Sequence, residues 1–400
     1  MLSKLLQKYL RFWAKLYLKR AKPKIIAITG SVGKTSTKNA IFEVLKAKFA
    51  SKVRKSEGNL NTATGLPLAI LGFSRAPSYS VSSLMWLPIT LWAPFRALFS
   101  TRAEWLVLEM AADKPGDIAY LTRIVQPQIA VITNIGESHL EAFGTREKLI
   151  QEKTSLFNSL SSDGLAIVNL DDEVIKKTVE SSNHRIRFYS IENIADVMAK
   201  NIMTEIDNYQ PTTQMQIIAG DTKFLAKVNT LGKVANVYPV LAAVAVAAEL
   251  KIEQSKILEG LLNIRAEDHR MNVVRGKNGA IIIDDCYNAS PLSMKAGLDA
   301  LKVLPAKRKI AVLGEMRELG SISTEAHRII GQYAHAVCNQ VLSVGEPARG
   351  YQADKHFPEK KELIGYLLNQ ISDGDIILIK ASRGPAKKSY LEEVVESLKE

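Results

Sequence analysis

The residues with the clearest chemical meaning lie in a glycine-rich turn, TGSVGKTS, at residues 29–36. Its glycines let backbone N–H groups face phosphate oxygens, its lysine offsets phosphate charge, and the hydroxyl of Thr35 suits Mg²⁺. The turn departs from the common P-loop at Ile28, where that motif has glycine. It nevertheless predicts a nucleoside triphosphate site. The residues expected around the phosphates are Gly30, Ser31, Val32, Gly33, Lys34, Thr35 and Ser36.

Two further polar residues follow apolar runs that are typical of buried strands. His139 lies in TNIGESHLE, directly after the run 129–133, and Glu109 ends the run 105–109. Parallel strands place their C-terminal ends, where ligands bind, at one edge of the sheet. A lone histidine is more often structural than a ligand. This edge and the carboxylate of Glu109 nevertheless predict Mg²⁺ ligands beside the glycine-rich turn.

Two polar turns in the second half of the chain also follow apolar runs. The turn DDCYNASP at residues 284–291 offers two carboxylates, an amide and a hydroxyl. These groups suit a polar substrate, although a solvated turn would have the same composition. The turn KASRG at residues 380–384 is basic and suits anionic groups. Because both turns lie far from residues 29–36 in sequence, a site that uses all three must lie between domains.

The order of the strands and helices expected around these residues indicates an α/β fold. A short apolar run precedes the glycine-rich turn and a helix, residues 34–49, follows it, as in a nucleotide-binding unit. Helical stretches separate most of the other apolar runs, so we expect a mostly parallel sheet with covering helices. The other candidate strands are residues 105–109, 129–133, 165–169, 280–284, 309–313, 340–344 and 375–380.

Three regions refine this organisation. Residues 190–230 alternate between apolar and polar side chains, which predicts a small antiparallel β element. Residues 241–250 are rich in alanine and predict a tightly packed helix. Near Arg270 a helical region ends and a new series of strands and helices begins, so we place a domain boundary there.

The composition is that of a globular protein. A chain of 400 residues with 46% hydrophobic and 24% charged residues favours two or three domains and excludes a largely disordered or fibrous protein. The two cysteines, Cys286 and Cys338, are too few for a disulfide framework. They predict reduced thiols in a cytosolic protein.

The net charge of +12 is concentrated at the N-terminus. Residues 1–24 hold eight lysines and arginines and no acidic residue. This distribution disfavours a basic groove across a folded domain and therefore nucleic-acid binding. In residues 1–22 the basic side chains recur every three or four positions, opposite leucines and aromatic residues, which predicts a basic amphipathic helix. Two interpretations are open: the helix lies in a membrane interface, or it packs on its own domain.

A second apolar segment, residues 81–99, is interrupted by Pro88, Pro94 and Arg96. It is barely long enough to span a bilayer, and its prolines disfavour a straight transmembrane helix. A buried loop with a helix fits the segment, and so does an interfacial or re-entrant hairpin. If the segment is exposed, it forms an apolar patch of the kind that marks a docking site.

Taken in order, several segments resemble the Mur ligase family. The resemblance runs from about Lys24 to the end of the chain, and DDCYNASP and LGEMRELG resemble the dipeptide-adding branch in particular. The segments are TGSVGKTSTK (29–38), GNLNTATGLPLAIL (58–71), LVLEMAADKPGDIAYL (106–121), TNIGESHLEAFGT (133–145), HRMNVV (269–274), DDCYNASPLSM (284–294), LGEMRELG (313–320) and KASRG (380–384).

The resemblance implies an architecture and a reaction. A P-loop ATPase domain with a mostly parallel sheet, residues 23–270, would follow the basic helix 1–22 and carry residues 81–99 as an insertion. A Rossmann-like α/β domain, residues 271–400, would bring the amine substrate. The enzyme would use ATP and Mg²⁺ to join the carboxylate of a muramoyl peptide to D-alanyl-D-alanine through an acyl phosphate, in peptidoglycan synthesis.

The resemblance also implies roles for individual residues. Lys34 and Thr35 would hold the triphosphate and one Mg²⁺, Glu109 would bind that metal, and His139 would bind a second. Lys153 occupies the place of a lysine that family members carbamylate, which would add an anionic metal ligand. Asn236 and Arg270 would contact the nucleotide. Asp285 and Arg383 are expected to be catalytic, as are Lys34, His139 and Lys153. The residues expected to contact substrate are Asn288, Ser290 and Lys380.

Two departures from the family leave the acceptor open. Relatives of this branch begin with a domain that binds the UDP moiety, whereas here the first strand is expected at Lys24. Of the family's adenine-side His-Asn-x-x-Asn pattern, only Asn236 remains. We therefore carry three interpretations: a ligase acting on the usual muramoyl peptide, the same ligase acting on a lipid-linked acceptor at the inner membrane face, and a membrane-bound ATP-binding scaffold. The complete metal set argues against the scaffold.

Overall fold

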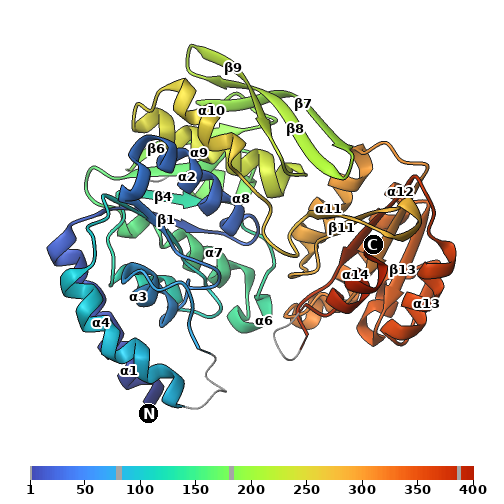
Figure 1. The fold of residues 1–400 in the computed structure, drawn as a ribbon, viewed down its shortest axis with the longest axis horizontal. Coiled ribbons are helices and arrows are strands. Elements are labelled where there is room, and N and C mark those ends of the chain that lie inside the picture. The colour runs from blue at the N-terminus through green and yellow to red at the C-terminus, as the bar shows by residue number, and fades with distance from the viewer. Residues whose placement is uncertain (1, 78–82, 180–183, 385–388) are drawn as a thin grey trace.

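The protein contains two sheets that lie side by side (Figure 1). The computed structural model describes residues 2–77, 83–179, 184–384 and 389–400. The first sheet has nine strands in the order β2-β3-β1-β4-β5-β6-β7-β8-β9, and the second has six in the order β10-β11-β15-β12-β13-β14. The expected α/β class with mostly parallel sheets is confirmed.

The first sheet is parallel from β2 to β7, with β1 at its centre. Its parallel strands are mostly unbroken runs of buried apolar residues, because helices cover both faces. The bounds are β1 (Lys24–Thr29), β2 (Val53–Lys55), β3 (Trp105–Glu109), β4 (Ile129–Ile132), β5 (Leu165–Asn169) and β6 (Arg185–Ser190).

An antiparallel extension follows, made of β7 (Val197–Asp207), β8 (Gln210–Ala219) and β9 (Thr222–Val228). Along β9, exposed and buried side chains alternate, because only one face of this part of the sheet meets the core. The antiparallel β element expected at residues 190–230 is confirmed, and it continues the first sheet.

Alternate residues of β1 enter two different cores. Ile26 and Ile28 face the core under α2 (Lys34–Phe49), α9 (Tyr238–Glu249) and α10 (Gln254–Leu262). Ile25 and Ala27 face the opposite core. The helices over that second core are α1 (Leu2–Ala21), α3 (Gly65–Ile70), α4 (Leu87–Phe99), α5 (Asp117–Thr122), α6 (Leu140–Phe143), α7 (Arg146–Thr154) and α8 (Glu173–Val179).

The basic N-terminal helix packs on its own domain, as one of its two interpretations requires. Leu10, Ala14 and Tyr17 of α1 are fully buried, and the Tyr9 hydroxyl donates to the carbonyl oxygen of Thr90 at 2.7 Å. Its lysines lie on the exposed side. The helix therefore has one face for its own core and a second, basic face for solvent or a partner.

The apolar segment at residues 81–99 is only half buried. Residues 81 and 82 lie outside the described residues, and α4 begins at Leu87. Pro88 stands in the first turn, where a proline breaks no helix hydrogen bond, and Pro94 lies inside the helix. Ile89, Ala93 and Ala97 are buried, while most of the other apolar side chains are exposed. The buried loop with a helix therefore describes only the inner face of the segment, and the outer face is the exposed apolar patch that the sequence left open.

The second sheet is parallel except for β10 (Asn272–Arg275), which pairs antiparallel with β11 (Ile281–Asp284). Its other strands are β12 (Arg308–Leu313), β13 (Gln340–Val344), β14 (Lys355–Phe357) and β15 (Asp375–Lys380). Its helices are α11 (Pro291–Val303), α12 (Ser323–Val337), α13 (Lys360–Gln370) and α14 (Glu392–Leu398). Shorter helical turns occur in both halves of the described chain. They are η1 (Ala50–Lys52), η2 (Ser83–Trp86), η3 (Phe157–Ser159), η4 (Lys233–Val237), η5 (Lys277–Gly279), η6 (Gly320–Ile322) and η7 (Glu346–Tyr351).

Candidate active site

The glycine-rich turn joins β1 to α2 and is fixed by the segment that follows β4. Gly30 has a φ of +147° and Gly33 a φ of +81°, which glycine adopts most readily. A Cβ at Gly30 would lie 2.0 Å from the Thr133 hydroxyl oxygen, so this position admits only glycine. The backbone N–H of Val32 donates to the side chain of Asn134 at 2.8 Å. The two sequence segments thus form one unit.

Two lysines, the half-buried Lys34 and the buried Lys153, converge on this turn. Nζ of Lys34 and Nζ of Lys153 donate to the carbonyl oxygen of Gly30, at 2.8 Å and 3.1 Å. Burial lowers the pKa of both side chains, and the positive charge of Lys34 helps to bring the pKa of Lys153 to about 7. Near neutral pH a fraction of Lys153 is therefore an uncharged amine, which is the nucleophilic form.

A buried carboxylate lies beside the first turn of α2. The Thr35 hydroxyl donates to Oε2 of Glu109 at 2.9 Å, and the Asn61 amide donates to Oε1 at 2.8 Å. Burial opposes ionisation, but the charges of Lys38, Lys34 and Arg270 outweigh it and hold the pKa of Glu109 below its usual range.

The donor set around Glu109 fits Mg²⁺. An ionised carboxylate and a hydroxyl are hard oxygen ligands of the kind this ion prefers. Nζ of Lys38 lies 3.6 Å from Oε2 of Glu109 and is buried without a hydrogen-bond partner. Sequence reasoning assigned no role to Lys38 or Asn61. Lys38 stands one helical turn after Lys34, and that spacing was the available signal.

His139 lies where the two halves of the protein meet. Its Nδ1 is 2.5 Å from Oε2 of Glu318, in the segment after β12, and its Nε2 is 3.7 Å from Oδ1 of Asp113. The backbone N–H of Glu141 also donates to the Glu318 carbonyl oxygen at 3.2 Å. The hydrogen bond with His139 lowers the pKa of Glu318. His139 is thus held between carboxylates of both halves, and its role as a metal ligand stays a prediction.

The turn at 284–291 and the turn at 380–384 meet at one edge of the second sheet. The register of that sheet pairs Asp284 with Ile379, so β11 and β15 end together. Nζ of Lys380 donates to Oδ2 of Asp285 at 2.5 Å and to the carbonyl oxygen of Asn288 at 3.0 Å. Burial raises the pKa of Asp285 despite the lysine. The buried Lys380 side chain thus joins the half-buried Asp285 carboxylate to the backbone of Asn288.

Ser290 is engaged in the structure of its own helix. It caps α11 in a reciprocal arrangement with Ser293, whose hydroxyl accepts the backbone N–H of Ser290 at 2.9 Å. This cap fixes the helix directly after the polar turn. A Cβ at Gly136, two residues beyond Asn134, would lie 3.1 Å from the Leu292 side chain. The start of α11 therefore packs against the segment that fixes the glycine-rich turn.

A single tyrosine ring lies between two arginines. The guanidinium carbon of Arg270 lies 3.8 Å from the ring centroid of Tyr287, and that of Arg383 lies 4.1 Å from it. Arg383 also donates to the Tyr287 hydroxyl at 2.6 Å. Nε of Arg270 is buried without a hydrogen-bond partner. The pair is suited to an anion, and sequence reasoning had not assigned Tyr287 a role.

A small pocket lies between α2 and the segment that leads into the second sheet. Its lining includes Ser36 and Asn39 of α2, together with Asn236, Glu267 and Arg270. The Asn236 side chain is buried and donates to the carbonyl oxygen of Thr230 at 3.0 Å. The pocket opens beside the helix that follows the glycine-rich turn.

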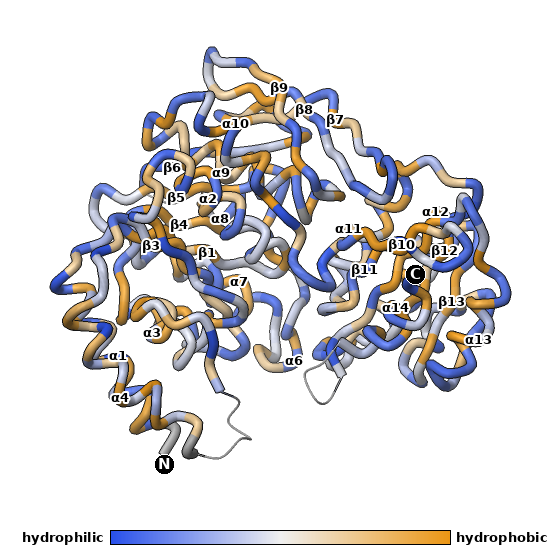
Figure 2. The backbone as a smooth tube through the Cα atoms, in the orientation of Figure 1, coloured by the Kyte–Doolittle hydropathy of each residue, from blue (hydrophilic) through white to orange (hydrophobic). Residues whose placement is uncertain are grey.

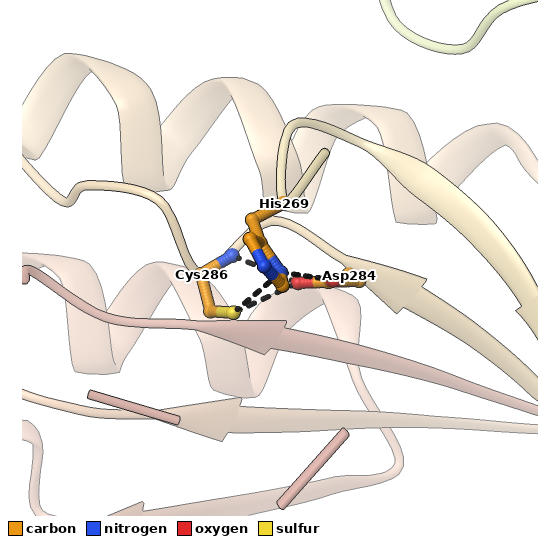
Figure 3. A group of neighbouring side chains, drawn as sticks. All are labelled: His269, Asp284 and Cys286. Atoms are coloured by element: carbon orange, nitrogen blue, oxygen red, sulfur yellow. Dashed lines mark hydrogen bonds and ion pairs between the residues drawn. The ribbon is translucent and has the colours of Figure 1, made fainter. Parts of the chain in front are cut away.

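A compact cluster ties the linker between the sheets to the end of β11 (Figure 3). Nδ1 of His269 lies 2.7 Å from Oδ2 of Asp284, and the Cys286 thiol lies 2.8 Å from Oδ1 of Asp284. Burial and the neighbouring Asp284 raise the pKa of Cys286, so it stays a thiol. Cys286 and Cys338 are both free, as expected. The cluster holds the linker beside Asp285 and Arg270.

Comparison with known proteins agrees with this geometry. The chain matches the Mur ligase middle domain over residues 87–247 and the Mur ligase, glutamate ligase domain over residues 269–383. It is 30% identical over 396 residues to the UDP-N-acetylmuramoyl-tripeptide–D-alanyl-D-alanine ligase of Bacillus subtilis, covering 96% of this chain and 78% of that protein. It is 29% identical to the enzyme of the same name from Escherichia coli, covering 94% and 77%.

Solved structures extend the likeness to the fold. MurF from Acinetobacter baumannii superposes with a TM-score of 0.81 at 26% identity, covering 98% of this chain and 79% of that one. MurF ligase from Thermotoga maritima, in complex with ADP, gives a TM-score of 0.81 at 28% identity, covering 98% and 83%. With family matches over residues 87–247 and 269–383 and relatives that align with nearly its whole length, the chain belongs to the Mur ligase family.

Proposed function

We propose that this protein is an ATP-dependent ligase that adds D-alanyl-D-alanine to a muramoyl peptide during peptidoglycan synthesis. The observation that carries the proposal is the meeting of both halves at the glycine-rich turn, where His139 contacts Glu318 and Gly136 adjoins Leu292. A ligase needs an activated carboxylate and an attacking amine in one enclosed place. The names of the relatives from Bacillus subtilis and Escherichia coli support the same reaction.

The residues at the glycine-rich turn are suited to bind the nucleotide and its metal ion. The backbone of the glycine-rich turn and Lys34 would hold the phosphates, while Thr35 and Glu109 would hold Mg²⁺. The metal ion would offset negative charge as the γ-phosphoryl group of ATP moves to the acceptor carboxylate. Asn236 and Arg270 line the pocket that would receive the rest of the nucleotide.

The second half would bind the dipeptide. D-alanyl-D-alanine has a carboxylate and an amine, so its site needs positive charge at one end and an acceptor at the other. Arg383, stacked on Tyr287, supplies positive charge. Asp285 would hold the amine, with Lys380 and Asn288 fixing its orientation. Contact between the halves would exclude water, which otherwise hydrolyses the acyl phosphate.

Lys153 would supply a further metal ligand after carbamylation. In carbamylation the uncharged Nζ of Lys153 adds to the carbon of CO₂, one C=O bond opens to give a carboxylate, and the nitrogen releases a proton to solvent. The step requires the uncharged amine, and burial with the neighbouring Lys34 brings the pKa of Lys153 to about 7. The product would be an anion at a position where the free side chain is a mixture of amine and ammonium near neutral pH. We propose that this anion completes the metal site next to the glycine-rich turn.

Mass spectrometry of reaction products tests the proposal. The full chain is incubated with ATP, Mg²⁺, D-alanyl-D-alanine and a UDP-linked muramoyl tripeptide. The acceptor should gain the mass of D-alanyl-D-alanine less one water, and phosphate should be released. A Lys34→Ala variant should form no product. Binding of ATP without any amide product from soluble or lipid-linked acceptors would contradict the ligase and favour the scaffold.

A second candidate keeps the chemistry and changes the acceptor. The exposed apolar face of α4 lies beside the basic face of α1. This arrangement favours an enzyme that acts at the inner face of the membrane, where its acceptor is a lipid-linked muramoyl peptide. We accordingly propose a cytoplasmic enzyme with a peripheral membrane contact. The same mass spectrometry, run with the lipid-linked acceptor in vesicles, separates the two acceptors by their product yields.

A further inference from the structure

Apolar side chains that are exposed to solvent gather on α1, η2 and α4. Among the residues that the structure describes, nine of the fifteen large exposed hydrophobic side chains belong to these three elements. On α4, Leu91 is 68% exposed, Trp92 54% and Phe99 69%. A patch of this kind on a soluble domain marks an interaction site. The nine residues, called the α1–α4 face below, are Leu5, Phe12, Met85, Leu87, Leu91, Trp92, Phe95, Leu98 and Phe99.

The two helices form one unit at the edge of the molecule. They run in the same direction, because Tyr9 bonds to Thr90 and Arg20 to Ser100. Figure 1 shows the pair at the lower left, on the side away from the second sheet. Figure 2 shows α4 largely in the colour of hydrophobic residues along this edge. A large surface could therefore bind α1 and α4 without covering the region where the two halves meet.

The outer face of α4 is more apolar than its own packing requires. Ile89, Ala93 and Ala97 already bury the inner face of the helix in the core. On the outer face, the rings of Trp92 and Phe95 lie 5.1 Å apart, and those of Phe95 and Phe99 5.0 Å apart. These rings form a ridge of exposed aromatic side chains. Tryptophan and phenylalanine are the side chains that seat an interfacial helix at the boundary of headgroups and acyl chains.

The charge around this ridge indicates which kind of surface binds it. Neither α1 nor α4 contains an acidic residue, and the first acidic residue of the whole chain is Glu43. Exposed lysines follow the outer side of α1 at Lys4, Lys8, Lys15 and Lys19. An anionic lipid surface attracts such a row, at about 1 kcal/mol for each basic residue. A second copy of this chain would bring two like-charged rows together.

From these observations we infer that the α1–α4 face docks the enzyme onto the surface of an anionic lipid bilayer. The aromatic ridge of α4 enters the interface, and the lysines of α1 bind lipid phosphate groups. The contact is peripheral: among the residues that the structure describes, no helix has the length and apolar character to span a bilayer. The docking deepens the membrane contact proposed above and does not depend on which acceptor the ligase uses.

Vesicle flotation with the full chain tests the inference. Vesicles of phosphatidylcholine with about one-third phosphatidylglycerol should carry the protein, and vesicles of phosphatidylcholine alone should carry at least about tenfold less. The binding to anionic vesicles should weaken with added salt, because the lysines act through screened charge. Equal recovery on both kinds of vesicle, or no recovery on either, would overturn the inference.

Two variants separate the apolar and the charged contributions. The first removes the aromatic ridge with Trp92→Ser, Phe95→Ser and Phe99→Ser. The second removes the charged row with Lys4→Gln, Lys8→Gln, Lys15→Gln and Lys19→Gln. Each should lose at least about tenfold in binding to anionic vesicles. All the replaced side chains are exposed, so thermal unfolding and ligase activity on a soluble acceptor should stay unchanged.

Matched controls use exposed residues far from α1 and α4. The apolar control is Ile194→Ser, Met203→Ser and Leu225→Ser, and the charge control is Lys200→Gln, Lys223→Gln, Lys227→Gln and Lys302→Gln. Both controls should float like the unmodified chain. If the controls lose as much binding as the α1–α4 variants, the docking is not specific to this face. If the chain is a dimer that the aromatic variant converts to a monomer, without any vesicle binding, the face joins two copies and the inference is wrong.

Discussion

At the residue scale, the environment of Lys153 couples folding to pH. Its pKa is about 7 in the folded protein, well below the ordinary value for lysine, because it is buried beside Lys34. Between pH 7 and the pKa of an exposed lysine, the unfolded chain binds a proton that the folded chain does not. The contribution of Lys153 therefore makes the folded state more stable as the pH rises through this window.

We predict that Lys153→Met abolishes this dependence. In the absence of nucleotide, the difference in unfolding free energy between the unmodified chain and the variant should change by up to about 1.4 kcal/mol per pH unit above pH 7, in favour of the unmodified chain. Urea denaturation at several pH values measures it. Lys177→Met, at an exposed lysine of α8, serves as the control and should show no such trend. A flat difference for Lys153→Met would contradict the lowered pKa.

The buried pair of Glu109 and Lys38 gives a second prediction at this scale. Glu109→Gln leaves the ammonium of Lys38 buried without an opposite charge 3.6 Å away, so the unfolding free energy should fall by about 3 kcal/mol. Because we propose Glu109 as a ligand of Mg²⁺, its replacement should also lower the ligase rate by at least about a hundredfold. Denaturation and rate measurements check both effects. Glu205→Gln, at an exposed residue of β7, should change neither.

At the element scale, the parallel strands were the most predictable part of the fold. The expected bounds of β3, β5, β13 and β15 agree with the structure, because fully buried strands are continuous apolar runs. The short strands β2 and β14 and the partly exposed strands β6 and β10 were not predicted. Their mixed burial breaks the apolar pattern, and β10 exists through its pairing with β11.

The junction of β1 and α2 gives a prediction at the same scale. In Gly30→Ala, the new methyl group would lie 2.0 Å from the Thr133 hydroxyl oxygen at a φ of +147°, so the turn must shift. The affinity for ADP should fall at least about tenfold, and stability should fall by about 1–3 kcal/mol. Calorimetric titration and thermal unfolding measure these changes.

Gly365→Ala in α13 is the matched control for Gly30→Ala. A Cβ there meets nothing within 4 Å, and the residue lies inside an exposed helical turn. The control should bind ADP normally and gain about 0.5–1 kcal/mol of stability. Normal ADP binding by Gly30→Ala would show that the turn tolerates a side chain and would contradict the role given to it.

At the scale of the whole molecule, contact between the halves decides whether water reaches the site. His139 and Glu318 form one side-chain pair of this contact, and both are partly exposed, so their pairing is worth only about 0.2–1 kcal/mol. We expect a pairing of this size to let the halves part for substrate entry and meet again for the reaction. We therefore expect the coupling between phosphate release and product formation to depend on this pair.

We predict that Glu318→Gln uncouples the two events. The variant should release more phosphate per molecule of amide product, because the acyl phosphate meets water more often when the halves separate. Parallel assays of phosphate and product give the ratio. Glu325→Gln, which removes an exposed partner of Arg328 on the nearby helix α12, should leave the ratio unchanged. An unchanged ratio in Glu318→Gln would show that the pairing does not protect the intermediate.

The sequence by itself determined the local units of this protein: the strand, turn and helix at residues 24–49, the buried parallel strands and the polar turns after them. Local units are readable because their signals come from neighbouring residues, through glycine conformation and hydrophobic periodicity. Only the tertiary structure decided which distant side chains meet, as Glu109 does with Lys38 and His139 with Glu318. It also decided which face of α4 is exposed, because an apolar helix can pack through any side until its neighbours cover one of them.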